Sequence, residues 1–123
     1  MVIGIGTDII EIKRIEEAVK KNSNFMKKCF TAREQELFES KKNNLHTIAG
    51  TFAAKEAVSK ALGTGFAKFE LKDIEIVRDE KGKPCVLLHN KAKEIMEQLM
   101  ISEILLTISH SREYAIAYAL AQN

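Results

Sequence analysis

This sequence of 123 residues has few cysteines and one proline, and its positive and negative charges nearly balance. Its two cysteines, Cys29 and Cys85, form no C-x-x-C motif and suggest no disulfide scaffold, so we expect a reducing cytoplasm. The formal net charge of +2 is too small to indicate a nucleic-acid-binding protein. A single proline, with no low-complexity segment or internal repeat, leaves no candidate linker between domains.

Long apolar runs are absent as well. Asp8 and Glu11 interrupt the apolar residues near the amino terminus, where a secretion signal would need a continuous apolar stretch. No stretch is long enough to predict a membrane span. We therefore expect neither export nor membrane insertion.

What remains is an ordinary globular composition, with 46% hydrophobic and 29% charged residues. A chain of this length can bury one core but hardly two, so residues 1–123 are expected to form a single domain. Basic residues concentrate between Lys13 and Arg33. That concentration suggests a docking surface for an acidic partner.

The amino-terminal residues predict a strand followed by a helix. The apolar residues 2–6 suit a buried strand, and Asp8 with Glu11 makes a plausible helix start. Asp8 is therefore expected at the junction between the strand and a helix that continues to about residue 20.

Two further helices are predicted before the middle of the chain. A short amphipathic connector at residues 25–30 precedes a capping box of Thr31 and Glu34, which predicts a helix to about residue 40. The alanine-rich residues 45–62 then predict a long central helix, because alanine has the highest helix propensity.

The carboxyl-terminal half predicts strands and one more helix. Its expected elements are a β-hairpin of residues 73–77 and 85–88, a helix of 92–100, and strands at 104–108 and 114–120 joined through 109–113. This order lacks the regular strand-helix alternation of a doubly wound sheet. We therefore expect an α+β fold whose mainly antiparallel sheet, with three strands from the carboxyl half and one from the amino terminus, surrounds the central helix.

The residues with the clearest chemical meaning lie in and just after the central helix. Glu56 and Lys60 are one helical turn apart, so their side chains share a face and can reach one ligand. Gly63 and Gly65 flank Thr64 and allow backbone amides to approach a phosphate. Each feature also has an ordinary structural explanation, since Glu-Lys pairs stabilise exposed helices and glycines commonly end them.

Four motifs occur in order along the whole chain. They are Gly4-Ile-Gly-Thr-Asp8 followed by Arg14, Phe52-Ala-Ala-Lys-Glu-Ala57 followed by Lys60 and Gly63-Thr-Gly65, the turn from Asp79 to Pro84, and Ile108-Ser-His-Ser111. Any one of them would be a weak signal. Together they resemble the bacterial holo-[acyl-carrier-protein] synthases.

The resemblance implies a phosphopantetheinyl transferase fold and activity. Members of this family transfer the 4′-phosphopantetheine arm of coenzyme A to a serine of acyl carrier protein, release adenosine 3′,5′-bisphosphate and use a divalent metal at the pyrophosphate. The residue types suit this reaction, since the serine hydroxyl needs a proton acceptor and the pyrophosphate needs positive charge. Another metal-dependent phosphoryl-group enzyme, or a non-catalytic module that binds coenzyme A or a carrier, stays open as an alternative.

By resemblance, Asp8 and Glu56 hold Mg²⁺, a hard ion that one or two carboxylates bind while phosphate oxygens and water complete its shell. An isolated aspartate before a helix would more often be an N-cap, and the family motif reverses that preference for Asp8. Glu56 has a second candidate role as the base that takes the serine proton, directly or through a water on the metal. Lys60 resembles the family's lysine near the scissile phosphate.

The resemblance also places Gly63, Thr64, Gly65, Pro84 and His110 at the coenzyme A site. For the three residues after the central helix, this implies a loop whose amides contact phosphate. His110 alone would more often be a residue of the connection between two strands, and the resemblance favours contact with coenzyme A.

One position departs from the family. Thr51 stands where an arginine often precedes the Phe-Ala-Ala-Lys-Glu-Ala motif, so a permanent cation for a phosphate is lost. Either the affinity for the nucleotide differs, or Lys55, Lys68 or Lys83 supplies a cation instead. Phe52 stands where relatives often have tryptophan, which is compatible with simple packing.

A surface for the carrier protein is also implied by the resemblance. Arg14 matches the family's arginine for docking acyl carrier protein, and Lys21, Phe25, Met26 and Lys28 could extend a basic and apolar surface beside it. Acyl carrier proteins are small and acidic, so this association should depend on salt. An ordinary solvated helix face is the alternative for each lysine.

Coenzyme A is long relative to so small a subunit. The resemblance implies a homotrimer whose active sites lie between neighbouring subunits. Asp8 and the helix that carries Glu56 would then belong to a different chain from parts of the coenzyme A pocket.

Overall fold

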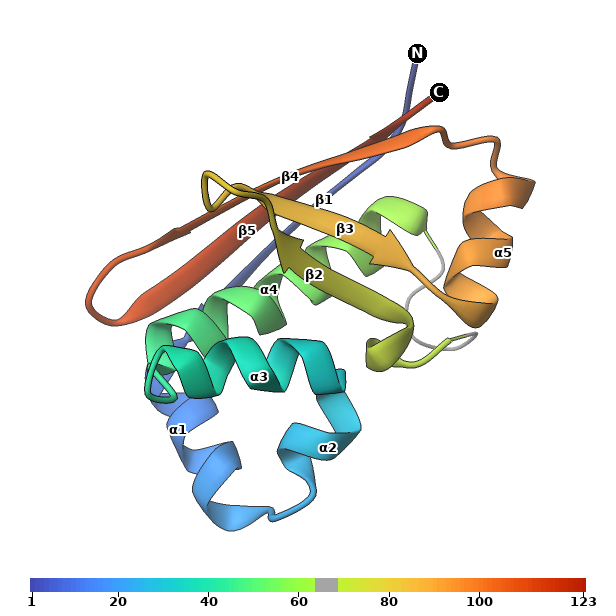
Figure 1. The fold of residues 1–123 in the computed structure, drawn as a ribbon. Coiled ribbons are helices and arrows are strands. Elements are labelled where there is room, and N and C mark those ends of the chain that lie inside the picture. Colours follow the sequence, from blue (N-terminus) through green and yellow to red (C-terminus); the bar gives the residue numbers. More distant parts are fainter. Residues whose placement is uncertain (64–68) are drawn as a thin grey trace.

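The computed structural model describes residues 1–63 and 69–123. Its amino-terminal half consists of β1 (Val2–Glu11), α1 (Ile12–Lys21), α2 (Phe25–Cys29), α3 (Ala32–Ser40) and α4 (Leu45–Leu62). Its carboxyl-terminal half consists of the 3-10 turn η2 (Leu71–Asp73), β2 (Ile74–Arg78), β3 (Pro84–Leu88), α5 (Asn90–Gln98), β4 (Glu103–His110) and β5 (Tyr114–Gln122). The α+β class and the expected order of elements are confirmed (Figure 1).

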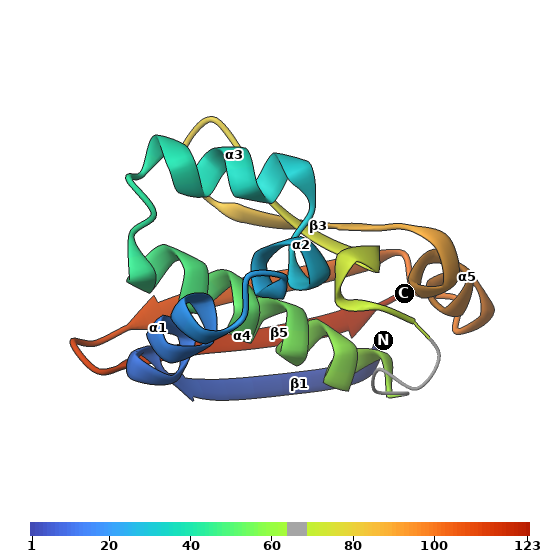
Figure 2. The same cartoon turned by 90° about the horizontal axis from the view of Figure 1, so that it is seen from below.

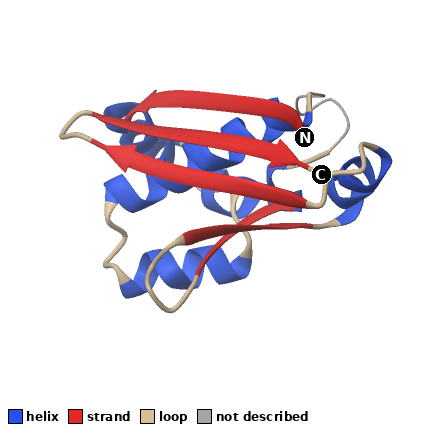
Figure 3. Ribbon diagram, turned by 90° about the horizontal axis from the view of Figure 1, so that it is seen from above, coloured by secondary structure: helices blue, strands red, loops and turns tan. Residues whose placement is uncertain are grey.

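The described strands form two antiparallel sheets. The first has the order β1-β5-β4, and the second is the β2–β3 hairpin. The prediction of three carboxyl-terminal strands in one sheet was therefore wrong, because only β4 and β5 pair with β1 in a common ladder. The hairpin lies beside β4 as a separate ribbon (Figure 3).

Local sequence signals determine where the helices begin and end. The predicted capping box is present, since Thr31 Oγ1 accepts from the Glu34 amide at 3.2 Å and Glu34 Oε1 accepts from the Thr31 amide at 2.9 Å. Asn44 caps α4 with its side-chain oxygen. Gly63 ends α4 with a φ of 78°, a left-handed conformation that glycine adopts without strain.

The first strand is longer than its sequence predicts. β1 continues through Glu11, where it still pairs with Tyr114 of β5, and α1 begins only at Ile12. Asp8 is consequently opposite Ala117 within the ladder, and its predicted position at the strand-to-helix junction was wrong. The N-cap position of α1 belongs to Glu11, which makes no side-chain capping bond.

Alanine side chains form the contact between α4 and the sheet. α4 contributes Ala53, Ala54, Ala57 and Ala61 to the main core, and β5 contributes Ala117, Ala119 and Ala121. All seven are buried, and they leave little volume between helix and strands. Close approach of the backbones gives dense packing where larger side chains would hold the elements apart.

The closest approach is between α4 and β1. A Cβ atom added at Gly6 would lie 2.0 Å from the Ala57 carbonyl oxygen, and one added at Gly4 would lie 2.0 Å from the Ala61 carbonyl oxygen. Neither position has room for a side chain. These two glycines therefore let β1 pass directly against α4, and strand glycines commonly mark such an approach.

A second group of buried residues joins the amino-terminal helices to the first half of α4. It includes Ile12 and Ile15 of α1, Phe30 after α2, Phe38 of α3 and Ile48 of α4. The helical spacing predicted for α1 is confirmed by the burial of its two isoleucines. Seen from below, α4 lies between the β1-β5-β4 sheet and the other amino-terminal helices (Figure 2).

Within the described part of the chain, no helix has the length and apolarity needed to cross a bilayer. The longest, α4, owes its buried surface to contacts with the sheet and with the neighbouring helices.

We predict that Gly6→Ala destabilises the fold. The new methyl group would force β1 away from the Ala57 carbonyl, at a cost of roughly 1–3 kcal/mol in the free energy of unfolding. Urea denaturation monitored by circular dichroism measures this loss.

Gly50→Ala is the matched control. Its new Cβ would meet only the Ile108 side chain, at 3.0 Å, and alanine gains about 0.5–1 kcal/mol over glycine within a helix. We expect its stability to stay within about 1 kcal/mol of the wild type. Equal stability of Gly6→Ala and the wild type would show that β1 does not need this close contact.

Candidate active site

Polar side chains from β1 and α4 meet where these two elements pass each other. Lys60 Nζ lies 3.3 Å from Asp8 Oδ1 and donates a hydrogen bond to the Thr7 carbonyl oxygen at 2.9 Å. Asp8 is on the same side of β1 as Gly4 and Gly6, because side chains alternate along a strand. The glycine contact with α4 therefore brings the Asp8 carboxylate to Lys60.

Glu56 belongs to the same cluster. It is half-buried one turn before Lys60. Burial raises the pKa of Glu56, the nearby Asp8 carboxylate raises it further, and the Lys60 ammonium acts in the opposite direction. The structure thus brings together the three side chains predicted for catalysis and metal binding.

This set of donors fits a hard divalent cation. Asp8 and Glu56 offer carboxylate oxygens, and a cation between them would relieve the repulsion that raises the pKa of Glu56. Among residues 1–63 and 69–123, no group of three or more His, Cys, Asp or Glu side chains is arranged to hold a metal ion. Two protein carboxylates suit Mg²⁺, which usually keeps several waters and phosphate oxygens as ligands.

The residues predicted to bind coenzyme A are spread over the subunit. Gly63 follows the last turn of α4, close in sequence to Lys60, whereas Thr64 and Gly65 lie outside the described residues. His110 is the last residue of β4, and its ring lies 5.0 Å from that of His46 in the first turn of α4. At about 1.5 Å per residue, the two ends of this helix are roughly 25 Å apart.

Pro84 has a third location. It is the first residue of β3 and lines a groove of about 620 Å³ between β3 and β4, together with Thr107 and Tyr118. β4 is separated from β1 by β5, so this groove is not on the edge of the sheet that carries Asp8. One subunit therefore does not bring Pro84 to the Asp8 cluster.

The position that departs from the family is buried. Thr51 is only 2% exposed, and its hydroxyl donates to the Thr47 carbonyl oxygen within α4. Phe52 packs against Phe25 with their ring centroids 6.0 Å apart, as its proposed packing role requires.

The three candidate substitutes for the missing arginine differ in position. Lys55 is fully buried and contacts Glu34, so the expectation that it could bind a phosphate was wrong. Lys83 is exposed at the edge of the groove beside Pro84. Lys68 lies outside the described residues.

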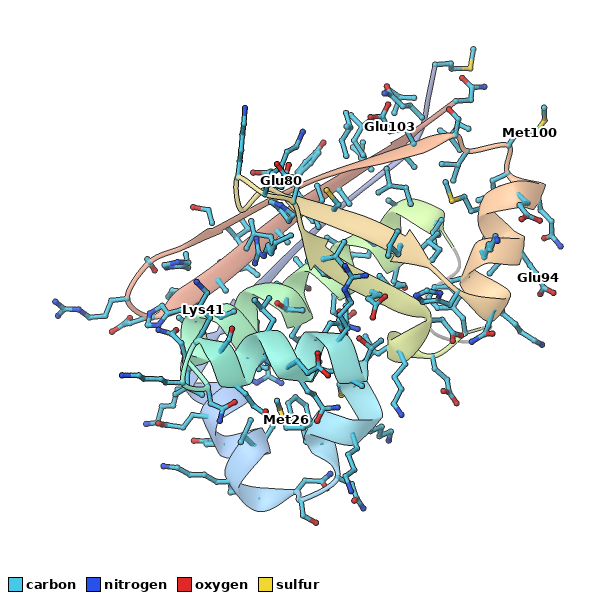
Figure 4. All side chains as sticks on the ribbon, in the orientation of Figure 1. Met26, Lys41, Glu80, Glu94, Met100 and Glu103 are labelled. Carbon is cyan, nitrogen blue, oxygen red and sulfur yellow. The ribbon has the colours of Figure 1, made fainter. Side chains whose placement is uncertain are left out.

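The predicted docking surface lies on α1 and α2. Arg14, Lys21 and Lys28 are exposed. Phe25 and Met26 are half-buried and pack against the core residues shared by the amino-terminal helices and α4, so they offer only part of their apolar surface to a partner. Met26 is labelled in Figure 4.

The face of the β1-β5-β4 sheet opposite α4 is apolar and uncovered by any described helix (Figure 3). Its exposed large side chains are Ile5, Ile9, Leu105, Tyr114, Ile116 and Tyr118. Ile9 pairs with Ile116 and the register continues across all three strands, so these side chains form one surface. Apolar patches of this kind usually mark an interface between proteins.

Sequence reasoning did not find all the residues that shape this site. Two glycines separated by one residue in a strand signal close approach of another backbone, which could have revealed the contact with α4. His46 beside His110 and Glu34 beside Lys55 have no comparable signal, because each pair is distant in sequence.

Comparisons with known proteins agree with this architecture. The 4′-phosphopantetheinyl transferase superfamily matches residues 4–119. The sequence is 54% identical over 121 residues to the holo-[acyl-carrier-protein] synthase of Alkaliphilus oremlandii, covering 98% of this chain and 99% of that relative. The structure is similar to that of the holo-[acyl-carrier-protein] synthase from Neisseria meningitidis, with a TM-score of 0.91, 32% identity and coverage of 100% of both chains. It is also similar to the Helicobacter pylori synthase in complex with coenzyme A, with a TM-score of 0.85, 36% identity and coverage of 96% and 99%.

Proposed function

Since the chain belongs to the 4′-phosphopantetheinyl transferase superfamily and, within it, to the holo-[acyl-carrier-protein] synthases, we propose that it is a Mg²⁺-dependent enzyme acting on coenzyme A and apo acyl carrier protein. It would transfer 4′-phosphopantetheine to a serine of the carrier and release adenosine 3′,5′-bisphosphate. The coenzyme A complex of the Helicobacter pylori relative supports the choice of donor. Because Cys29 and Cys85 are free thiols, we also propose that the enzyme is cytoplasmic.

The observation that carries this proposal is the meeting of Asp8, Glu56 and Lys60. Each comes from a different motif or helical turn, and the fold places them together. Two carboxylates and one ammonium are the groups that a reaction at a pyrophosphate needs, since it requires charge neutralisation and a proton acceptor. A solvent-exposed Glu-Lys helix pair would not require Asp8 on the adjacent strand.

In the proposed reaction, Asp8 and Glu56 would hold Mg²⁺, which neutralises charge on the pyrophosphate when bound. The serine oxygen forms a bond to the phosphorus of the pantetheine arm, and the bond from that phosphorus to the bridging oxygen breaks. The electron pair of that bond leaves with adenosine 3′,5′-bisphosphate. Glu56 accepts the serine proton, and Lys60 stabilises the negative charge of the phosphates.

We propose that the active site lies between subunits of a homotrimer. In one chain, His110 is at the end of α4 opposite Gly63, so both could contact one coenzyme A molecule more easily if they came from different chains. The uncovered apolar face of the β1-β5-β4 sheet offers a surface for such an assembly. Each subunit would supply its Asp8 cluster to one site and its Pro84 and His110 to another.

We propose that acyl carrier protein docks on α1 and α2. Arg14 is exposed on α1, the helix that follows β1, and β1 carries Asp8. The neighbouring Lys21 and Lys28 add positive charge for an acidic partner. The carrier's serine could thus be presented toward the strand that holds Asp8.

The first prediction concerns the reaction itself. Incubation with Mg²⁺, coenzyme A and apo acyl carrier protein should increase the carrier's mass by one phosphopantetheine, measured by mass spectrometry. Glu56→Gln and Asp8→Asn should each lower turnover by roughly a hundredfold or more, because each removes a charge without changing size.

Glu94→Gln is the isosteric control, since Glu94 is exposed on α5 (Figure 4), a helix that packs mainly on η2 and β3. It should keep wild-type turnover. No mass increase with the wild type, or hydrolysis of a nucleoside triphosphate in its place, would contradict the proposed activity. Near-normal turnover of Glu56→Gln would remove Glu56 from the site.

The second prediction concerns docking. Arg14→Ala should raise the KM for acyl carrier protein by up to about fivefold at low salt, as expected for an exposed charge pair. The difference should shrink at high salt because the interaction is screened.

Lys93→Ala on α5 serves as the control, since Lys93 is exposed and lies outside the proposed docking surface. Its KM values should match those of the wild type. If Arg14→Ala changed only the KM for coenzyme A, the carrier would not dock at Arg14.

The third prediction concerns assembly. Glu56→Gln and His110→Ala chains should each be nearly inactive alone, whereas co-expressed chains should recover activity. Random mixing in a ring of head-to-tail interfaces gives about a quarter of the sites an intact pair. Light scattering of the same sample should show one species with the mass of three chains. A monomer, or no recovery in mixed assemblies, would show that one chain supplies both residues to a site.

A further inference from the structure

A buried ion pair links α4 to the helix α3. Lys55 Nζ lies 2.6 Å from Glu34 Oε1, and neither side chain is more than 1% exposed. Lys55 immediately precedes Glu56 in α4. The proposed reaction uses neither member of this pair.

Both members have a complete set of partners. Lys55 also donates to the carbonyl oxygens of Leu71 at 3.1 Å and Ile74 at 2.6 Å, so its three hydrogens each have an acceptor. Glu34 accepts from the Ile76 amide at 2.8 Å in addition to the Thr31 amide. No buried side-chain nitrogen or oxygen lacks a partner among the described residues. The pair therefore ties α4 to α3, to η2 and to the start of β2.

Stability alone is a poor explanation for such a pair. Burial lowers the pKa of Lys55, and the Glu34 carboxylate opposes this change. The energy needed to remove two charges from water can exceed their attraction, and apolar residues of similar size often replace a buried pair without loss of stability. Apolar contacts, unlike hydrogen bonds, do not fix the rotation of a helix about its axis.

The rotation of α4 about its axis needs such a contact, because the hydrophobic residues of this helix do not define one buried face. Its buried residues occur on all sides, and they are Ile48, Ala49, Gly50, Thr51, Ala53, Ala54, Lys55, Ala57, Val58, Ser59, Ala61 and Leu62. An amphipathic stripe usually sets the rotation of a helix about its axis, and this helix lacks one. In its second half, two long polar side chains hold it from different sides, Lys55 toward α3, η2 and β2 and Lys60 toward β1.

We propose that Lys55 is a positioning residue that fixes the rotation of α4 and thereby directs Glu56 toward Asp8. This inference rests on the proposed role of Glu56 in metal binding. At a radius of about 5–6 Å, a helix rotation of about 10° moves a side chain by about 1 Å. A displacement of that size in a catalytic site can cost about a hundredfold in rate.

The double variant Lys55→Met/Glu34→Gln tests this inference. It removes both charges together, so no unpaired charge is left in the core, and glutamine keeps one oxygen to accept from the amide of Thr31 or of Ile76. We expect a folded protein with its KM for acyl carrier protein unchanged and its kcat lowered about tenfold to a hundredfold. Mn²⁺ binding in the presence of coenzyme A, measured by electron paramagnetic resonance, should weaken about tenfold or more.

Two single variants test whether a loss of Mn²⁺ affinity comes from the rotation of α4, from the loss of the buried charge or from lower stability of the fold. Glu34→Gln leaves the Lys55 ammonium without its carboxylate and should lower the melting temperature. It keeps one oxygen acceptor for Lys55, so its Mn²⁺ affinity should stay within about twofold of the wild type because the helix stays tied. Val58→Ala opens a cavity in the core beside α4 and should lower the melting temperature without changing Mn²⁺ affinity. A loss of Mn²⁺ affinity in Val58→Ala equal to that of the double variant would attribute the effect to stability and overturn the proposal.

A second variant keeps the test decisive if the double variant does not fold. Lys55→Leu in the Glu34→Gln background also removes every donor at position 55 and puts a branched apolar side chain of similar volume in its place. Wild-type Mn²⁺ affinity and kcat in whichever variant folds would overturn the positioning role. Failure of the proposed function is distinguishable, because the wild-type chain would then neither modify the carrier nor bind Mn²⁺ with coenzyme A.

Discussion

The contact between the backbones of β1 and α4 is the constraint on which the rest of the structure depends. Gly4 and Gly6 leave no side chain between the strand and the helix, and the carbonyls of Ala57 and Ala61 occupy that space. Asp8 follows on the same face of β1 and so reaches Lys60. The separation of the metal-binding carboxylates proposed here is thus determined by two glycines that carry no chemistry themselves. Alanines on α4 and β5 extend this close packing across the sheet.

The helix α4 also separates the candidate site residues into two groups. Its second half carries Glu56 and Lys60, while His46 and His110 meet beside its first turn. Among the described residues, the groove beside Pro84 is lined by neither group. The uncovered apolar sheet face and this separation favour the same arrangement, in which neighbouring copies complete each other's sites. Lys55 adds an internal requirement, because a helix buried on all sides needs a directional contact to present Glu56 correctly.

Local signals in the sequence predicted most of the elements. The Thr31–Glu34 capping box and the alanine-rich run of α4 act over a few residues, so their outcome did not depend on the rest of the fold. Asp8 was misplaced because helix-start rules are local, whereas the ladder with β5, more than a hundred positions away, extends β1 to Glu11. Lys55 was misassigned for the same reason, since its partner Glu34 is brought to it only by tertiary packing. Family resemblance supplied the roles of Asp8, Glu56 and Lys60, and the fold supplied their proximity.

The proposed active site requires Asp8 and Glu56 to bind a divalent cation at the pyrophosphate of coenzyme A. Anomalous X-ray scattering from crystals grown with Mn²⁺ and coenzyme A tests it most directly, because it locates the metal without assuming its ligands. We expect a Mn²⁺ peak within coordinating distance of both carboxylates and of the pyrophosphate oxygens, with Lys60 beside the phosphates. A peak elsewhere, or bound coenzyme A with the Lys60–Asp8 ion pair intact and no metal at these carboxylates, would contradict it.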